Sequence, residues 1–288
     1  MTLAVAAPAG AIDRAKLEAG VSVLVELAPQ ALLRVDESVL RQEGYLAGAD
    51  AERAAHLAEL MTAPDLGAVL CARGGFGTSR LLPLLDLDAL AASRRLLMGS
   101  SDCTALLNAL AAKGLVVLHG PMISQLPRLD QTSRGAFAQL FSGQPQWPLV
   151  LAGNPVSPGK AEGLLWGGNL TMLCHLLGTP WMPPLQGGIL FLEEINEPPY
   201  RLDRLLTQLE LAGVLGQITG LALGELSNSG DDSAQLSDLA ARRLGGLGLP
   251  MLSGLPFGHG PCNMPLPIGA RAELDAGAGL LTVGLDLA

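Results

Sequence analysis

Short apolar runs alternate with amphipathic stretches over roughly the first 120 residues. Apolar runs with the length and composition of buried strands lie at residues 3–7, 21–27, 69–72, 95–98 and 115–119. Between them, apolar residues at helical spacing predict helices at 51–61, 79–85, 87–92 and 104–113. Strands that alternate with helices are typical of a parallel sheet with helices on both faces. We therefore expect an α/β domain at residues 1–125.

The alternation stops between residues 126 and 158. This stretch carries five prolines with polar residues between them: Pro127, Pro145, Pro148, Pro155 and Pro158. Proline fixes its own backbone and removes a hydrogen-bond donor, so it interrupts regular structure. The stretch is predicted to connect two domains.

From residue 159 the chain is rich in glycine, and periodic elements return. Leu202, Leu205, Leu206 and Leu209 follow the i, i+3, i+4, i+7 pattern, which predicts an amphipathic helix at 201–212. Further helices are expected at 170–177 and 236–244. Strands are expected at 188–192, 220–226 and 251–255, with a final pair near 271–274 and 280–285. These elements predict a second domain at 159–288.

Composition narrows the classes of protein. Apolar residues make up 49% of the 288 residues, enough for a sizeable core, and charged residues only 16%. The formal net charge of -9 argues against nucleic-acid binding, which needs clustered Lys and Arg. No uninterrupted apolar run approaches the roughly 18 residues of a membrane span, and the N-terminus lacks the basic start of a signal peptide. We expect a cytoplasmic protein without membrane or nucleic-acid partners.

The potential metal ligands are scattered along the sequence. The cysteines are Cys71, Cys103, Cys174 and Cys262, and the histidines are His56, His119, His175 and His259. Neither set has the spacing of a metal or redox motif, so we expect reduced thiols, no metal and no cofactor.

The segment 96–104 places Ser101 between a predicted strand and a predicted helix. A serine in such a tight turn resembles a nucleophile elbow, where free N–H groups at the helix N-terminus can stabilise an oxyanion. Cys103 stands where the usual elbow has its second glycine. Ser100, Ser101 and Asp102 could instead serve only as helix caps.

Two further segments carry groups that could assist such a serine. Glu193 and Glu194 end the predicted strand at 188–192, and a carboxylate there can orient a catalytic group; they could also be ordinary acids leading into the next turn. His259 lies between two glycines after the strand at 251–255 and could act as a general base or be a simple loop histidine. Serine, acid and histidine in this chain order occur in catalytic triads, which makes a serine hydrolase a hypothesis.

Seven motifs together resemble the LD-carboxypeptidase family. They lie at residues 73–82, 99–105, 119–122, 165–170, 177–181, 189–201 and 254–259. The resemblance implies a flavodoxin-like parallel-sheet N-terminal domain and a smaller β-rich C-terminal domain. The sequence departs from the family pattern at Ala9, where a serine is frequent, and at Ser100, where a bulky residue is frequent.

The resemblance also implies roles for individual residues. The nucleophile falls on Ser101, the relay acid on Glu193 and the histidine on His259. The backbone N–H groups of Asp102 and Gly75 would form the oxyanion hole. Trp166 and Asn169 would contact the substrate. The active site would lie between the two domains of a homodimeric protein.

The implied reaction is release of terminal D-Ala from murein tetrapeptides during peptidoglycan recycling, by cleavage of an L,D-amide bond. A second reading retains the chemistry but changes the substrate to the peptidyl or aminoacyl nucleotide conjugates cleaved by the microcin-immunity branch. A third reading is a binding protein that has lost catalysis, against which the intact Ser101, Glu193 and His259 argue.

Overall fold

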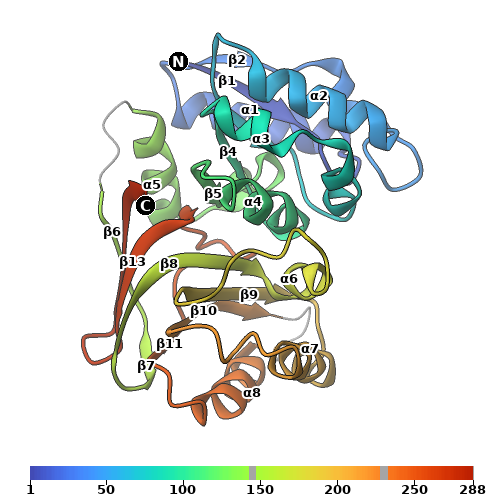
Figure 1. Ribbon diagram of the computed structural model, residues 1–288. Coiled ribbons are helices and arrows are strands. Elements are labelled where there is room, and N and C mark those ends of the chain that lie inside the picture. The colour runs from blue at the N-terminus through green and yellow to red at the C-terminus, as the bar shows by residue number, and fades with distance from the viewer. Residues whose placement is uncertain (143–146, 228–232, 288) are drawn as a thin grey trace. The chain divides into compact units, whose positions relative to one another are not determined.

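The computed structural model describes residues 1–142, 147–227 and 233–287, which form two compact units. The first unit comprises Met1–Gln146 and Met264–Leu266, and the second comprises Trp147–Asn263 and Pro267–Ala288. In Figure 1 most of the first unit is blue to green, and the second runs from yellow-green to red.

A six-stranded sheet forms the centre of the first unit (Figure 1), in the order β12-β5-β4-β3-β1-β2. The strands are β1 (Thr2–Ala6), β2 (Leu32–Arg34), β3 (Leu66–Cys71), β4 (Leu96–Gly99), β5 (Val117–His119) and β12 (Leu266–Ile268). All neighbours from β2 to β5 are parallel. The α/β class and parallel sheet predicted for this half of the chain are confirmed.

Helices pack in two groups around this sheet. The helices are α1 (Arg14–Leu27), α2 (Asp50–Thr62), α3 (Leu87–Ala92), α4 (Thr104–Ala111) and α5 (Gln131–Phe141), joined by the 3-10 turns η1 (Glu37–Leu40), η2 (Thr78–Arg80), η3 (Leu82–Leu84), η4 (Ser101–Cys103) and η5 (Ile123–Arg128). Helix α1 contacts η5 and α5, whereas α2 contacts α3, and α3 contacts α4. Every residue of α4 is buried, so this helix anchors the turn that precedes it.

The strand predicted at 21–27 is wrong, because these residues form the second half of α1. Asp13 caps this helix by accepting a hydrogen bond from the Lys16 N–H at 2.8 Å. Gly20 allows the helix to lie directly against the backbone of Ile123, where a Cβ would overlap with it. Three valines in the run suggested a strand, but a well-capped, closely packed helix overrides that weak preference.

An eight-stranded mixed sheet forms the second unit, in the order β6-β14-β13-β8-β9-β10-β11-β7. Its strands are β6 (Leu149–Ala152), β7 (Asn154–Ser157), β8 (Lys160–Asn169), β9 (Ile189–Ile195), β10 (Gly220–Ser227), β11 (Met251–Ser253), β13 (Ala270–Asp275) and β14 (Leu280–Leu287). Strands β8 to β11 are parallel, and the outer strands are antiparallel. The β-rich second domain is confirmed.

Three helices complete the second unit: α6 (Leu170–Leu176), α7 (Pro199–Leu211) and α8 (Ser233–Gly245). Helix α7 buries Leu202, Leu206 and Leu209, in keeping with the apolar pattern read from the sequence. At the end of β8, Gly167 has φ 136° and lies so close to the Phe191 carbonyl that any side chain would overlap with it. This glycine brings the ends of β8 and β9 together.

The boundary between the units falls inside the stretch 126–158 that the prolines marked as a connector. Its described residues contain the second half of η5, together with α5, β6 and β7. Regular elements therefore continue between the prolines. Pro127 lies inside η5, and Pro155 lies on β7 at the edge of the second sheet, where a missing N–H is tolerated.

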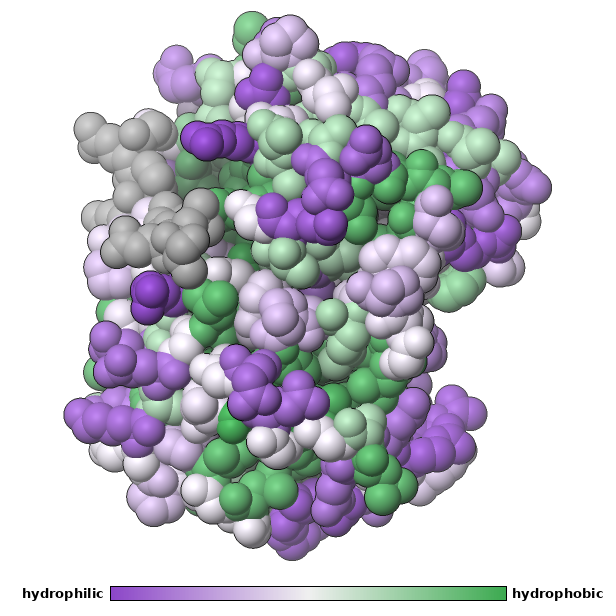
Figure 2. Space-filling model, viewed as in Figure 1, coloured by the Kyte–Doolittle hydropathy of each residue, from purple (hydrophilic) through white to green (hydrophobic). Residues whose placement is uncertain are grey.

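The surface mixes hydrophilic and hydrophobic residues on the face seen in Figure 2. The most exposed large apolar side chains, Leu32 and Leu211, belong to different elements. No helix in the described part of the chain is long and apolar enough to cross a membrane.

Candidate active site

Ser101 lies in a strained turn between β4 and α4. Its φ of 57° is in the left-handed region that residues other than glycine rarely adopt. Strand β4 ends at Gly99, η4 begins at Ser101, and α4 follows at Thr104. A strained serine between a parallel strand and a helix is the geometry of a nucleophile elbow.

The glycine loop after β3 borders Ser101. A Cβ on Gly74 would lie 2.9 Å from the Ser101 Oγ and 3.4 Å from the Asp102 nitrogen. The absence of that side chain allows the loop to lie close to both the hydroxyl and the Asp102 N–H. The Gly74 carbonyl accepts a hydrogen bond from Gly10, so the Gly75 N–H of the same trans peptide points the other way. Asp102 and Gly75 as oxyanion donors remain predictions, and Gly74 is a neighbour that the sequence reading did not single out.

Asp102 links the elbow to this glycine loop. Its Oδ2 accepts a hydrogen bond from the Thr78 N–H at 2.8 Å, and its carbonyl accepts one from the Thr78 hydroxyl at 2.5 Å. Burial raises the pKa of the Asp102 carboxyl, opposed by hydrogen bonds from Thr78 and Gly77 and by the charge of Arg53. Buried Arg53 donates to the carbonyls of Pro8, Gly48 and Gly77. The loops around Ser101 are therefore held by one buried network.

Two residues beside Ser101 are packed into the interior. The Ser100 side chain is fully buried, and its Oγ donates to the Gln125 Oε1 at 3.2 Å. A hydrogen bond with Cys71, together with burial, raises the pKa of the Cys103 thiol well above its ordinary value. Ser100 thus has a structural partner, and Cys103 in place of the second elbow glycine packs as a core residue.

Glu193 and His259 meet in the second unit. The Glu193 Oε2 lies 2.6 Å from the His259 Nδ1, and the carboxylate side chain is fully buried. Two residues before each of them, Phe191 and Phe257 pack edge to face with ring centroids 5.6 Å apart. This aromatic contact fixes the strand and the loop that carry the pair. Within its own unit, the His259 Nε2 has no hydrogen-bond partner among the described residues.

The His259 imidazole is surrounded by negative charge. Burial alone would lower the pKa of His259, but the charge and hydrogen bond of Glu193 and the charges of Glu194 and Glu225 outweigh it, so the pKa is raised. A carboxylate on one ring nitrogen and a second nitrogen without a partner form the arrangement of a general base oriented by an acid.

Glu194, the next residue on β9, accepts hydrogen bonds from neighbouring residues. Its oxygens accept hydrogen bonds from the Asn169 amide at 2.9 Å, from the Thr171 N–H at 2.8 Å and from the Ile195 N–H at 2.9 Å. Burial and the charge of Glu193 raise the pKa of Glu194. The Asn169 Oδ1 accepts a hydrogen bond from the Met172 N–H and caps α6. Asn169 is thus engaged in its own unit, where Trp166 on β8 is also buried; substrate contacts by either remain predictions.

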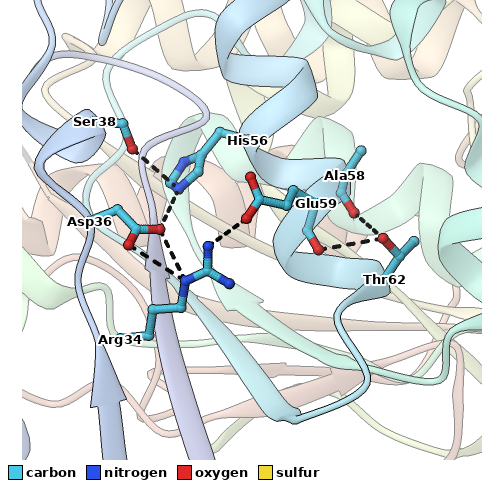
Figure 3. A network of polar contacts seen from close by, with 7 residues as sticks. All are labelled: Arg34, Asp36, Ser38, His56, Ala58, Glu59 and Thr62. Carbon is cyan, nitrogen blue, oxygen red and sulfur yellow. Dashed lines mark hydrogen bonds and ion pairs between the residues drawn. The ribbon is translucent and has the colours of Figure 1, made fainter.

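The first unit contains another group of serine, histidine and aspartate, shown in Figure 3. The His56 Nε2 lies 3.3 Å from the Ser38 Oγ and 3.3 Å from the Asp36 Oδ2. A relay needs the acid and the nucleophile on different ring nitrogens, whereas here both face the same one. Asp36 also pairs with Arg34, which reaches Glu59 on α2. This network therefore ties β2 and the η1 segment to α2 and does not form a second triad.

The structure thus brings Glu193 and His259 together in one unit and presents Ser101 at an elbow in the other. Assembly of the three into one triad remains a prediction. In the described ranges 1–142, 147–227 and 233–287, no three His, Cys, Asp or Glu side chains are grouped in a way that could hold a metal ion.

Known proteins share both halves of this chain. The model of the LD-carboxypeptidase N-terminal domain matches residues 3–120, and that of the C-terminal domain matches residues 162–274. The crystal structure of muramoyltetrapeptide carboxypeptidase from Oxalobacter formigenes is 35% identical, with a TM-score of 0.87 and complete coverage of both chains. Murein tetrapeptide carboxypeptidase of Pseudomonas aeruginosa is 35% identical over 246 residues, covering 80% of each chain. The protein is therefore a peptidase.

More narrowly, the chain belongs to the LD-carboxypeptidase family. The microcin C7 self-immunity protein of Escherichia coli is also similar, being 29% identical over 266 residues and covering 80% of this chain and 77% of its own.

The raised pKa of His259 gives an expected pH dependence. As the predicted general base for Ser101, His259 must be neutral to accept a proton, so kcat/KM should fall as the pH is lowered through its pKa. Because that pKa is raised, the midpoint of the acid limb should lie above the ordinary histidine value of about 6.5. The pH profile of kcat/KM for a murein peptide measures this midpoint. A midpoint at or below the ordinary value would contradict this electrostatic account.

Proposed function

We propose that the protein is a serine LD-carboxypeptidase that releases terminal D-Ala from murein tetrapeptides. The observation that carries the proposal is the 2.6 Å contact between Glu193 and His259, which orients a histidine whose other nitrogen has no hydrogen-bond partner in its own unit. The strained elbow at Ser101 supplies the matching nucleophile.

In the proposed reaction, the Ser101 hydroxyl attacks the carbonyl carbon on the L side of the amide bond, and its proton passes to the His259 Nε2. Glu193 accepts a hydrogen bond from the His259 Nδ1–H and stabilises the imidazolium. The Asp102 and Gly75 N–H groups hold the oxyanion. His259 then protonates the leaving D-Ala nitrogen, and a water activated by His259 hydrolyses the acyl-enzyme.

The names of the relatives support the substrate class. A tetrapeptide carboxypeptidase is 35% identical over 80% of this chain, and the solved muramoyltetrapeptide carboxypeptidase matches the whole fold. We further propose that the enzyme works in the cytoplasm, as a homodimer, in peptidoglycan recycling.

The runner-up function is hydrolysis of a peptidyl or aminoacyl nucleotide conjugate. The 29% identity to the microcin C7 self-immunity protein favours it as an alternative. Both functions use one serine mechanism, so the substrate alone distinguishes them.

A substrate panel decides between the two functions. The tetrapeptide L-Ala-D-Glu-diaminopimelate-D-Ala should lose one D-Ala, whereas the pentapeptide, an all-L analogue and an aminoacyl sulfamoyl-adenosine should be poor substrates. A fixed triad accepts the carbonyl from one face, so inverting a centre misplaces the side chains, and kcat/KM should fall. Mass spectrometry identifies the products, and initial rates under identical conditions give kcat/KM for each substrate. Preferred cleavage of the nucleotide conjugate would favour the alternative, and equal cleavage of the all-L analogue would contradict the stereospecificity.

A further inference from the structure

Strand β10 has a register shift opposite Glu193. Leu223 pairs with Leu192, and Leu226 pairs with Glu194, so two residues of β10, Gly224 and Glu225, span the position opposite one residue of β9. A bulge of this kind redirects a side chain and is frequent beside active sites.

Glu225 holds the loop that carries His259. Its Oε2 accepts a hydrogen bond from the Gly260 N–H at 2.5 Å, and its own backbone N–H donates to the Phe257 carbonyl at 2.9 Å. These hydrogen bonds fix the loop backbone on both sides of His259.

The glycines that flank His259 depend on the same side chain. A Cβ on Gly258 would lie 2.7 Å from the Glu225 Cβ, and Gly258 also has φ 145°. A Cβ on Gly260 would overlap with the Glu225 carboxylate. The Gly-His-Gly sequence is therefore what allows the loop to lie directly on Glu225.

The half-buried carboxylate of Glu225 also borders a cavity of about 510 Å³ in the second unit. Gly260, Pro261 and Cys262 line the same cavity. A small anion in this space could approach the loop if the Glu225 side chain were removed.

We propose that Glu225 is a positioning residue for His259, which it holds in place through the Gly260 N–H and the Phe257 carbonyl of the same loop. The negative charge of this carboxylate also favours the protonated imidazole. The carboxylates that act on the imidazole are Glu193 and Glu194 of β9 and Glu225 of β10. Glu193 touches the ring, whereas Glu225 acts through the loop backbone. The kinetic part of this inference rests on the proposed function.

Two variants separate the hydrogen bond from the charge. Glu225→Gln keeps an acceptor oxygen for the Gly260 N–H, whereas Glu225→Ala removes both. In Glu225→Ala, displacement of the base should lower kcat/KM on the order of 100-fold. Glu225→Gln should keep most of its plateau activity and move the acid limb of its pH profile to lower pH. Glu273→Gln, at an exposed acid on β13, is the matched control and should match the wild type in both readouts.

Formate tests the positioning role directly. Added formate should partly restore Glu225→Ala, because the adjacent cavity admits a small carboxylate, while chloride at equal ionic strength should not. Wild-type kcat/KM in Glu225→Ala would overturn the inference. A second combination of results would also contradict the inference. In it, folded Glu225→Ala has a lowered kcat/KM that formate does not restore, and Glu225→Gln has the wild-type pH profile.

A second readout needs no substrate. The imidazole resonance of His259, assigned with His259→Asn, should titrate at lower pH in Glu225→Gln than in the wild type and be unchanged in Glu273→Gln. An unchanged titration in folded Glu225→Gln would overturn the electrostatic role whether or not the protein cleaves a peptide. A shifted titration in a protein inactive on every peptide of the panel would instead support Glu225 and contradict the proposed function.

Discussion

Replacing Ser101 with alanine is expected to leave a folded protein whose kcat is lower by a factor on the order of 10⁶, the scale seen when a triad serine is removed. In the proposed mechanism the hydroxyl oxygen forms the covalent bond to the acyl group, and alanine has no group that can take that step. Alanine keeps the Cβ, so it should leave the packing against Gly74 unchanged. Turnover of the tetrapeptide and the melting temperature measure the two effects.

Ser100→Ala is the matched control for this variant. Ser100 is buried and bonded to Gln125, so its loss should cost stability, on the order of 1 kcal/mol for one buried hydrogen bond, and little turnover. If Ser100→Ala were the inactive variant and Ser101→Ala the active one, the assignment of the nucleophile would be off by one residue.

Removing either member of the Glu193–His259 pair should be nearly as damaging. His259→Ala loses the general base and should approach the effect of Ser101→Ala, while Glu193→Gln should lower kcat on the order of 10⁴-fold because the amide favours the wrong imidazole tautomer. Combined with Ser101→Ala, neither change should add much, since the three residues of the proposed triad would act as one unit. Single and double variants assayed on the tetrapeptide test this non-additivity.

Glu194→Gln provides the comparison on the same strand. Glu194 is committed to Asn169, Thr171 and Ile195, so its substitution should affect stability more than turnover. Full activity in Glu193→Gln would move the relay acid elsewhere, with Glu194 or Glu197 the next candidates.

The parts of the fold that follow a regular pattern were predictable from the sequence. Most of the parallel strands carry short apolar runs, and α7 carries leucines at helical spacing; both patterns follow from burial. The parallel strands β2 and β8 were not predicted. The run at 21–27 was misassigned because its valines favour a strand locally, while the contact of Gly20 with Ile123 that favours the helix is remote in sequence. Such contacts leave no periodic signal.

In the candidate site too, some residues could be predicted from the sequence and others could not. Ser101, Glu193 and His259 lie in short motifs at the ends of strands, so the motifs were readable, and the resemblance assigned their roles. Glu225 lies in no motif, and its role depends on a register shift that the sequence does not display. The glycines beside His259 were the only signal that a neighbour approaches this loop closely.

The steric contact between Glu225 and the two glycines also constrains how this loop can evolve. While position 225 carries a glutamate, a larger residue at 258 or 260 meets its side chain. At position 260 a shorter residue at 225 would have to come first, and it would free the loop before any new contact could form. Gly258 is more restricted, because its φ of 145° and the Glu225 Cβ, which every residue except glycine has, both exclude a side chain there.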